Sequence, residues 1–398
     1  MAGGPLEGIS VLSFCTALSG PFCTMVLGDM GAEIIKIESI DEGDLTRGST
    51  HQIKGVGSYF LSVNRGKKSI TLDLKNDRGK KIVIDLMKTV DVLTENFRPG
   101  VMKRLGFDYE TVHKINPKLV YASISGFGQT GPYAHKPAFD MIAQAMGGVI
   151  SITGPVKPGS PPCRVGYSIG DIAASLFTVS GILAALIERG KSGEGQMLDI
   201  SMLDSQVALC ENAIVRYLGT GEICRPLGSR HPTSTPFEAY ETLDKPIVLI
   251  ANTEKLWASF CKAAGKEEWL TDERYNTKYV RLANYEAFYP LMVDLMKTKT
   301  YRQWADLFDA HEVMYAPINK IEDVVVDPQV IAREMIVEVE HPQVGKHKIA
   351  GTPLKFSRTP CKIDKAAPEL GADTCEVLSK RLGLTDDQIE GLKKEKII

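Results

Sequence analysis

The strongest constraint on the fold is an alternation of strand-like and helix-like segments between residues 9 and 124. The strand-like segments are residues 9–14, 32–37, 69–74, 91–94 and 119–124, and helical patterns occupy residues 20–29 and 77–90. Strands that alternate with helices pair in parallel, because each helix carries the chain back along the sheet before the next strand begins. We therefore predict an α/β fold with a parallel sheet and helices on both of its faces.

The chain length suggests more than one domain. A turn at residues 190–196 leads to a strand at 197–202 and a helix at 203–217, and a Gly- and Pro-rich loop follows. We expect four parts: residues 1–217 begin a large domain, 218–228 are a linker, 229–325 form a smaller α/β domain, and 326–398 return to complete the large domain. This last part contains strand patterns at 335–339 and 347–349 and a charged helix at 385–396.

Composition narrows the class of protein. The 398 residues are 43% hydrophobic and 24% charged, with a formal net charge of −2, so nothing marks the chain for nucleic acid or for a membrane surface. Its longest apolar runs are interrupted by Ser, Thr, Gly or a charge, and no secretory signal is visible at the N-terminus. The eight cysteines contain no Cys-x-x-Cys pair, which favours reduced thiols and a cytoplasmic location. The seven histidines are dispersed, so we expect no metal site.

Loops beyond the carboxyl ends of parallel strands collect ligands, and here they are residues 15–21, 75–78, 95–100 and 126–132. Cations lie in or near two of them: Lys75, Arg98, Lys103 and Arg104. Such residues suit phosphates, although a solvated basic helix has the same composition. The first loop lacks the Gly-x-Gly-x-x-Gly pattern and the chain has no Walker-type loop, so an NAD enzyme and a P-loop ATPase are disfavoured.

Asp171 stands where a long apolar helix is expected to begin, directly after Gly170. We expect Gly170 to allow a sharp turn and Asp171 to occupy the N-cap, where the helix dipole favours an ionised carboxylate. Such a carboxylate caps the helix or attacks an acyl group, and both roles remain open. Asp140, just before another helical pattern, has the same capping alternative.

Ser168 lies in Gly166-Tyr-Ser-Ile-Gly170, which matches the Gly-x-Ser-x-Gly elbow of serine hydrolases. That elbow follows a buried strand, whereas Pro161 and Pro162 argue against a strand here. A hydrolase based on Ser168 remains a minor alternative.

Several strings occur in order along the chain. They are Gly20-Pro21, Leu27-Gly-Asp-Met-Gly-Ala-Glu-Ile-Ile-Lys-Ile-Glu38, Gly43-Asp-Leu-Thr-Arg47, Asn64-Arg-Gly-Lys-Lys-Ser-Ile-Thr-Leu-Asp-Leu74, Glu95-Asn-Phe-Arg-Pro-Gly100, Ser125-Gly-Phe-Gly-Gln-Thr-Gly-Pro132, Gly170-Asp171, Gly193-Glu-Gly-Gln196, Ala316-Pro-Ile318, Asp327-Pro328 and Gly351-Thr-Pro-Leu-Lys-Phe-Ser357. From about Leu6 onward this set resembles the class III CoA-transferase family, which also includes formyl-CoA transferase and the α-methylacyl-CoA racemases.

The resemblance implies a Rossmann-like large domain with a smaller domain, assembled as an interlocked homodimer. It implies CoA thioesters as substrates, with no permanently bound cofactor, and Asp171 as the catalytic nucleophile. Asp171 would form a mixed anhydride with the acyl group and then an aspartyl-CoA thioester, so that CoA passes from an acyl-CoA donor to a carboxylic acid acceptor.

Family CoA contacts carry over to matching positions in this sequence: Leu72, Lys75, Asn96, Phe97, Arg98, Arg104 and Asp140. Leu18, Phe139 and Tyr167 are candidates for the acyl pocket, and their apolar to aromatic character suggests a medium or branched acid.

Departures from the family pattern narrow the reaction. The racemases have a proton-transferring His where this chain has Phe139, which favours CoA transfer over racemisation. Formyl-CoA transferase has Gln and Trp where this chain has Leu18 and Ser49, which argues against formate and oxalate. Ser39 replaces an arginine that contacts CoA in the family. We therefore expect an acyl-CoA:carboxylate CoA-transferase, with a racemase, a Ser168 hydrolase and a non-catalytic CoA-binding protein as alternatives.

Overall fold

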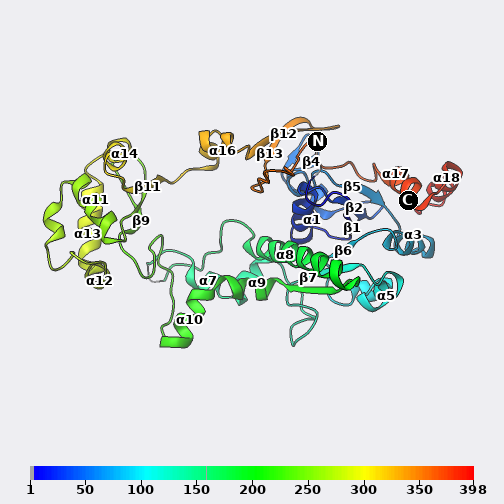
Figure 1. Ribbon diagram of the computed structural model, residues 1–398, viewed down its shortest axis with the longest axis horizontal. Coiled ribbons are helices and arrows are strands. Elements are labelled where there is room, and N and C mark those ends of the chain that lie inside the picture. The colour runs from blue at the N-terminus through cyan, green and yellow to red at the C-terminus, as the bar shows by residue number, and fades with distance from the viewer. Residues whose placement is uncertain (1–3, 158) are drawn as a thin grey trace. The chain divides into compact units, whose positions relative to one another are not determined.

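The computed structural model describes residues 4–157 and 159–398, and the chain forms two compact units (Figure 1). The first unit comprises the chain up to Ile150 together with Arg164–Glu222 and Pro328–Ile398. The second comprises Ser151–Cys163 and Ile223–Asp327. The expected small domain, residues 229–325, falls within the second unit, which also takes in a segment that we had placed in the large domain.

A six-stranded parallel sheet forms the centre of the first unit in the described part of the chain. Its strands are β1 (Ser10–Ser13), β2 (Glu33–Glu38), β5 (Lys68–Thr71), β6 (Val92–Glu95), β7 (Val120–Ser125) and β8 (Met197–Ser201). They lie in the order β5-β2-β1-β6-β7-β8, so the predicted α/β class is confirmed. The chain builds outward from β1 in one direction and from β6 in the other, so the strand order reverses between these two strands. In this Rossmann-like arrangement, ligands bind beyond the carboxyl ends of the strands at that switch point.

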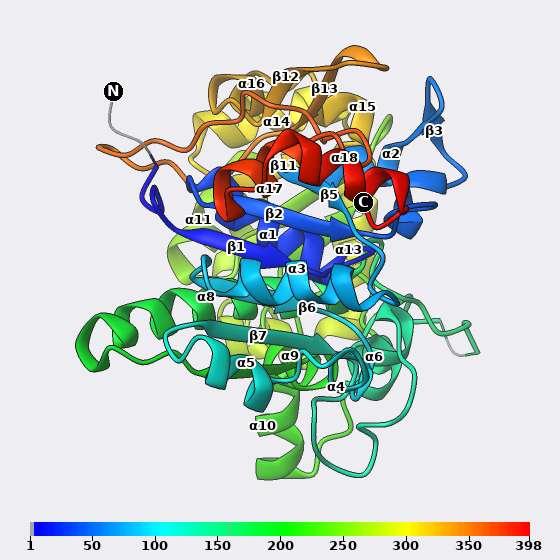
Figure 2. The same ribbon diagram turned by 90° about the vertical axis from the view of Figure 1, so that its right-hand side faces the viewer.

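Apolar side chains of successive strand residues point to opposite faces of the sheet. Leu12 and Ile35 join a core with α3 (Asp77–Met87), α5 (Tyr109–Ile115), α17 (Thr374–Leu382) and α18 (Asp386–Lys394). Val11 and Ile34 join a core on the other face with α1 (Ser19–Asp29), α6 (Asp140–Met146), α8 (Ile169–Ser192) and α9 (Met202–Leu209). In Figure 2, α3 crosses in front of the strands. The sheet is therefore buried on both faces, as its apolar strands predict.

Helix α8 is 24 residues long and connects the carboxyl edge of the sheet to its amino edge before β8. By length and composition alone it is able to cross a membrane, with a mean hydropathy of 1.8 and 44% burial over its most apolar stretch. The core helix of a soluble protein passes the same test, so this is weak evidence for a membrane. The helix predicted at 203–217 is two helices, α9 and α10 (Glu211–Thr220), which meet at Cys210.

Shorter elements complete the first unit. Between β2 and β5 lie the 3-10 turn η1 (Leu45–Gly48), the strands β3 (Gln52–Ile53) and β4 (Val56–Gly57), and α2 (Ser58–Val63). Helix α4 (Val101–Leu105) follows β6, and α7 (Val149–Ile152) contains the boundary at Ile150 where the chain leaves the first unit. The returning segment adds α16 (Pro328–Ala332) and an antiparallel hairpin of β12 (Ile336–His341) and β13 (Gly345–Ala350). Helix α17 had no counterpart among the predicted elements.

The second unit has an antiparallel sheet in the order β11-β10-β9. Its elements are β9 (Phe237–Tyr240), β10 (Ile247–Ile250), α11 (Glu254–Ala264), η2 (Glu267–Leu270), α12 (Lys278–Ala283), α13 (Tyr285–Met296), α14 (Tyr301–Ala310), β11 (Met314–Pro317) and α15 (Ile321–Val324). An aromatic core that includes Trp257, Phe260 and Trp304, all fully buried, holds these helices on the sheet.

Candidate active site

Asp171 lies inside the first turn of α8 rather than at its N-cap. The helix begins at Ile169, and the N-cap position belongs to Ser168, whose side chain makes no capping hydrogen bond. The prediction that Asp171 caps this helix is therefore wrong. Gly170 is itself helical, so its predicted role in a sharp turn is also wrong.

Asp140 supplies the cap that α8 lacks, from a neighbouring helix. Its Oδ1 accepts a hydrogen bond of 2.8 Å from the backbone N–H of Gly170, and its Oδ2 accepts one of 2.7 Å from Gln144 Nε2. A Cβ at position 170 would stand 3.0 Å from Asp140 Oδ1, so the glycine permits this close approach. The alternative that Asp140 caps its own helix is wrong, because Phe139 occupies the N-cap of α6.

Asp171 serves helix α1 in a similar way. Ser19 is the first residue of α1, and its hydroxyl and backbone amide are the two donors that lower the pKa of the Asp171 carboxylate. The N-cap of α1 is Leu18, which has no polar side chain to offer. The first amides of a helix lack partners within it and favour a nearby negative charge. Each acid therefore caps a helix other than its own.

Burial raises the pKa of Asp171 to about 7, and the negative charge of Asp140 acts in the same direction. The two hydrogen bonds from Ser19 oppose this effect without overcoming it. Our expectation that the helix start keeps this carboxylate ionised is therefore wrong, because the loss of water outweighs the helix amides. Near neutral pH the group divides between its protonated and ionised forms, which is a property of many catalytic acids and bases.

A buried ion pair fixes the loop that carries Ser19. Lys36 Nζ lies 2.7 Å from Asp44 Oδ2 and also donates to the carbonyl oxygen of Cys15. Asp44 Oδ1 accepts the backbone N–H of Ala17 at 3.3 Å, and Ala17 has a φ of +62°, in the left-handed region. We did not predict this pair. Its signal in the sequence is a lysine within an otherwise apolar strand, followed by an aspartate in the Gly43–Arg47 string.

Asn96 joins the loops that follow β1 and β6. Its Oδ1 accepts the Thr16 N–H at 2.9 Å, and its Nδ2 donates to the Thr16 carbonyl at 2.8 Å and to Ser19 Oγ at 3.1 Å. The predicted contact between Asn96 and CoA is untested, but the side chain already spends its two N–H groups within the fold.

The other residues predicted to contact CoA lie along the same carboxyl edge. Leu72 follows β5 with its side chain buried in the core, so only its backbone is available, whereas Lys75 is exposed. Phe97 is half-buried, and Arg98 and Arg104 are exposed. Arg98 lines a cavity of roughly 180 Å³ together with Lys103, Tyr109 and Gln129. Their contacts with CoA stay predictions.

Glu95 also lines this cavity. It is buried, its Oε2 accepts the Phe97 N–H at 2.8 Å, and its Oε1 accepts the Ser123 hydroxyl. Burial raises its pKa to about 7. Glu95 therefore holds the loop that carries Arg98; we had placed it in the ligand loop 95–100 without assigning it a role.

The three residues predicted for the acyl pocket differ in exposure. Leu18 is buried, whereas Phe139 is 75% exposed and Tyr167 is 55% exposed. Tyr59 of α2 is a further side chain near the two acids: burial raises its pKa, the charges of Asp171 and Asp140 add to the shift, and Ser168 hydrogen-bonds its hydroxyl. Tyr59 was missed because its short helix carries no motif.

Comparison with known proteins identifies the family. The model of CoA-transferase family III matches residues 6–374. The chain belongs to this family. It is 39% identical to an acetyl-CoA:oxalate CoA-transferase of Acetobacter aceti, over 89% of this chain and 90% of that protein. It is 36% identical to a succinyl-CoA:glutarate CoA-transferase of Mus musculus, over 98% of this chain and 89% of that protein.

A solved structure shares the fold. A CaiB/BaiF family protein from Brucella suis superimposes with a TM-score of 0.84 at 32% identity, covering 95% of this chain and all of that one. The protein is therefore an enzyme of the class III CoA-transferases, and its substrates are CoA thioesters and carboxylates. The resemblance inferred from the ordered strings is confirmed.

The structure around Ser168 does not match the serine-hydrolase alternative. A nucleophile elbow requires a strand directly before the serine. In the described residues between Ile152 and Ser168 the backbone forms no strand, and Ser168 instead precedes the first residue of α8. The described residues also contain no group of three or more His, Cys, Asp or Glu side chains suited to a metal. That the CoA-transferase needs no metal stays a prediction.

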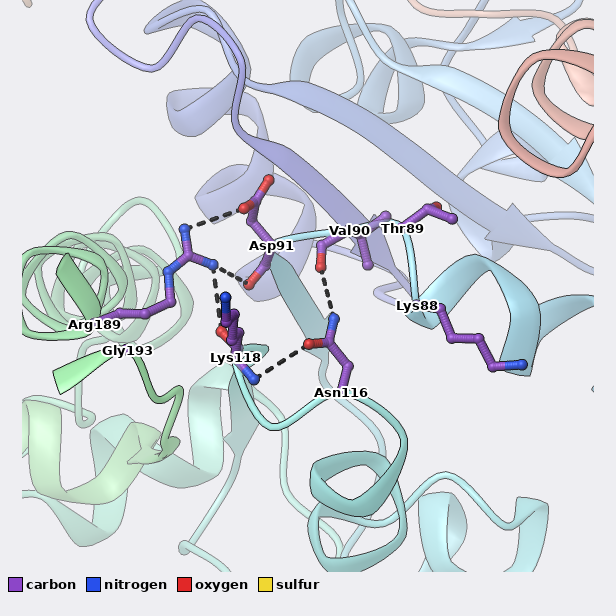
Figure 3. Close-up of a pocket in the computed structure, with 8 residues that line it drawn as sticks. All are labelled: Lys88, Thr89, Val90, Asp91, Asn116, Lys118, Arg189 and Gly193. Atoms are coloured by element: carbon purple, nitrogen blue, oxygen red, sulfur yellow. Dashed lines mark hydrogen bonds and ion pairs between the residues drawn. The ribbon is translucent and has the colours of Figure 1, made fainter.

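A second cavity, of roughly 460 Å³, lies at the amino edge of the sheet (Figure 3). Arg189 pairs with Asp91 at 3.1 Å and also donates to the Lys118 carbonyl, while Asn116 Nδ2 donates to the Val90 carbonyl. Arg189 is eighteen residues beyond Asp171 on α8, about 27 Å along the helix axis. This cavity is therefore separate from the candidate active site, and its main polar groups bind one another.

Proposed function

We propose that the enzyme transfers CoA from an acyl-CoA donor to a carboxylic acid with Asp171 as the nucleophile. The ionised Asp171 attacks the thioester carbonyl, forming a mixed anhydride and releasing the CoA thiolate. The thiolate attacks the aspartyl carbonyl, giving an aspartyl-CoA thioester and the free donor acid. The acceptor carboxylate then attacks this thioester and releases the thiolate again. Attack of the thiolate on the acceptor acyl group forms the new thioester and restores Asp171.

The position of Asp171 is the observation that carries this proposal. Its carboxylate lies at the start of α1, directly beyond β1, at the switch point of the sheet. Removal from water leaves a carboxylate that is a stronger nucleophile than one in solution. The Ser19 hydroxyl and amide are donors able to hold negative charge on the oxygens as the anhydride and thioester form and break.

The relatives support a class of acceptor. Both curated relatives described above carry names that pair a CoA thioester with a short dicarboxylic acid, oxalate or glutarate. We infer short dicarboxylic acids as acceptors, in place of the medium or branched acids suggested by the apolar pocket residues and against the expectation from Leu18 and Ser49 that oxalate is not a substrate. A panel of dicarboxylic, straight-chain and branched acids, tested against acetyl-CoA and succinyl-CoA, decides between them. Exchange with branched monocarboxylic acids alone would exclude this inference.

Substitution of Asp171 tests the mechanism. We expect Asp171→Ala and Asp171→Asn to lower CoA exchange by roughly 10³-fold or more, because no other group replaces the attacking oxygen. Ser168→Ala is the matched control and is expected to keep exchange. Retained exchange in both Asp171 variants would make the residue only a cap for α1. Loss of exchange in Ser168→Ala alone would favour the hydrolase alternative, and solvent deuterium at the α-carbon without an acceptor would favour racemisation.

We propose a homodimer on the basis of an uncovered apolar surface on the first unit. Helix α10 has no buried residue, and its apolar side chains Val215, Tyr217 and Leu218 are 57–76% exposed. Helix α8 exposes Phe177 and Ile187 in addition. Exposed apolar side chains of this size are often covered by a partner, and the family predicts a second, interlocked copy.

Sedimentation in solution tests the dimer. We expect the mass of two chains, and we expect Leu218→Glu to weaken assembly because it places a charge on the apolar face of α10. A monomer at micromolar concentration would exclude the homodimer, and binding of the intact protein to lipid vesicles would assign the surface to a membrane instead. A cytoplasmic location is a further proposal, supported by the free thiols of Cys15, Cys23, Cys163, Cys210, Cys261, Cys361 and Cys375.

A further inference from the structure

Asn96 connects the loop expected to bind CoA with the residue that contacts Asp171. It directly precedes Phe97 and Arg98, and its side chain crosses the switch point from β6 to the loop after β1. There it holds the peptide of Thr16 on both sides and reaches the hydroxyl of Ser19. This one amide therefore joins the two loops at the mouth of the site.

The hydrogen bond to Ser19 has a direction. The Asn96 Nδ2 group is a donor only, so Ser19 Oγ accepts at 3.1 Å. A serine hydroxyl has one proton, and with its oxygen held by Asn96 that proton points away from the amide. The Asp171 carboxylate is the acceptor whose pKa the Ser19 hydroxyl lowers, and Ser175 lies within hydrogen-bond distance of the backbones of both residues. The order of donation is Asn96 to Ser19 to Asp171.

The backbone of Ser19 is fixed as well. Ser175, one turn further along α8 from Asp171, donates its hydroxyl to the carbonyl oxygens of Ser19 and Asp171, at 2.6 Å each. The start of α1 and the first turns of α8 are thus bound to each other. The Ser19 hydroxyl is left with rotation about its side chain as its main freedom, and Asn96 restricts that rotation.

We propose that Asn96 is a positioning residue that holds the Ser19 hydroxyl as a donor to Asp171. The inference rests on the proposed role of Asp171 as nucleophile and deepens it. It assigns the Asn96 side chain this positioning role in place of the predicted contact with CoA. Asn96 and Arg98 lie on the same loop. A shift of this loop when CoA binds therefore changes the hydrogen bonding of the nucleophile.

Three further ionisable groups lie around Asp171 and Tyr59, and of these Asp140 shifts the pKa of Asp171. Asp140 faces it from α6, Tyr59 lies near it from α2, and Arg164, in the segment before α8, acts on Tyr59. In the described part of the chain, the side-chain hydrogen bonds of Asn96 go to Thr16 and Ser19 and not to these three groups. Substitutions at Ser19 and Asn96 therefore change the donors to Asp171 without removing those charges.

The test is the acid limb of kcat/KM in a double-mutant cycle of Ser19→Ala and Asn96→Ala. This limb reports the ionisation of the free enzyme. Loss of a donor to an ionised carboxylate raises its pKa, so we expect each single variant to move the limb up by roughly one pH unit. Because both act on one hydrogen bond, the double variant is expected to move it no further than Ser19→Ala does.

Arg98→Ala is the control in the same loop, and it is expected to raise the KM for acyl-CoA without moving the limb. The proposal is overturned if Asn96→Ala, like Arg98→Ala, raises only the KM. It is also overturned if the shifts of the acid limb in the two single variants add up in the double variant. If Asn96→Ala fails to fold, Ser19→Ala alone decides, since it leaves the Asn96–Thr16 contacts intact, and an unmoved limb overturns the proposal. Retained exchange in Asp171→Ala would instead overturn the proposed function.

Discussion

Asp140 accepts the backbone N–H of Gly170 at 2.8 Å, one residue before Asp171, so the acid that caps α8 also places a negative charge beside the proposed nucleophile. Capping favours the folded chain, whereas the charge raises the pKa of Asp171. The two effects come from one carboxylate and are separable at Gly170, because an amide oxygen still accepts its N–H without carrying a charge, although the amide NH2 group no longer accepts the hydrogen bond from Gln144.

Asp140→Asn is expected to move the acid limb of kcat/KM to lower pH. The neutral amide no longer opposes ionisation of Asp171, so the pKa falls by about 0.5–1 unit. Asp140→Ala also loses the acceptor for Gly170, and we expect it to lower the free energy of unfolding by roughly 1–3 kcal/mol. Rate–pH profiles and denaturant unfolding measure the two effects. A limb that stays in place in Asp140→Asn would show that its charge does not act on the reacting group.

Asp171→Asn is expected to stabilise the protein at pH 8. The pKa of Asp171 is about 7 in the folded chain and near 3.8 when unfolded, so the folded state holds the extra proton between these values. Stability due to this group is therefore greatest below pH 4, falls as the pH rises through 7, and is lowest above it. Replacing the carboxyl removes a penalty on the order of 2–4 kcal/mol at pH 8.

Thermal melts of wild type and Asp171→Asn at pH 5 and pH 8 check this result. The gain in melting temperature is expected to be larger at pH 8 than at pH 5. An equal gain at both values would mean that the carboxyl titrates normally in the folded chain.

The layers of the fold were predictable from the sequence because strands and helices alternate with a clear change of period. The strand segments near β1, β2, β6 and β7 needed only small corrections at their ends, as expected where apolar runs set the core. The start of α8 was not predictable in the same way. Its cap comes from Asp140, thirty residues away, and no local pattern at Ser168 or Gly170 announces a cap from another helix.

The same limit applies to the site. Asp171 was identified because the ordered family strings mark it, and Arg98 because a cation lies on a strand-end loop. Tyr59 acts through contacts made by tertiary structure, so its type and position gave no chemical signal, whereas the lysine in the apolar strand at Lys36 was a signal whose partner, Asp44, only the fold reveals. The pKa of Asp171 depends on burial, which a helix-start pattern does not report.

Lys36→Met is expected to destabilise the protein by about 3–5 kcal/mol, because it leaves Asp44 buried without its partner. It also releases the carbonyl of Cys15, so a loss of kcat should accompany the loss of stability. Lys68→Met is the matched control: Lys68 pairs with Glu33 and Glu376 at partly exposed positions, and a cost below about 1 kcal/mol is expected. Equal costs for the two variants, measured by urea unfolding, would contradict the role assigned to the buried pair.

Arg98→Ala is expected to raise the KM for acyl-CoA by roughly 10-fold, with a weaker dependence on salt, because a cation that meets phosphate is removed. Lys118→Ala is its counterpart at the cavity on the opposite edge of the sheet, and its KM should match the wild type (Figure 3). Steady-state kinetics of both variants at two salt concentrations show which edge of the sheet binds CoA. A raised KM in Lys118→Ala with none in Arg98→Ala would place CoA at the wrong edge for Asp171.

Trapping the covalent intermediate tests the central claim most directly. The enzyme is incubated with acyl-CoA without an acceptor, treated with hydroxylamine, digested and analysed by mass spectrometry. We predict a hydroxamate on the peptide that contains Asp171, dependent on acyl-CoA and absent from Asp171→Asn. Modification of Ser168 instead, or full turnover with no modified carboxyl group, would contradict the account.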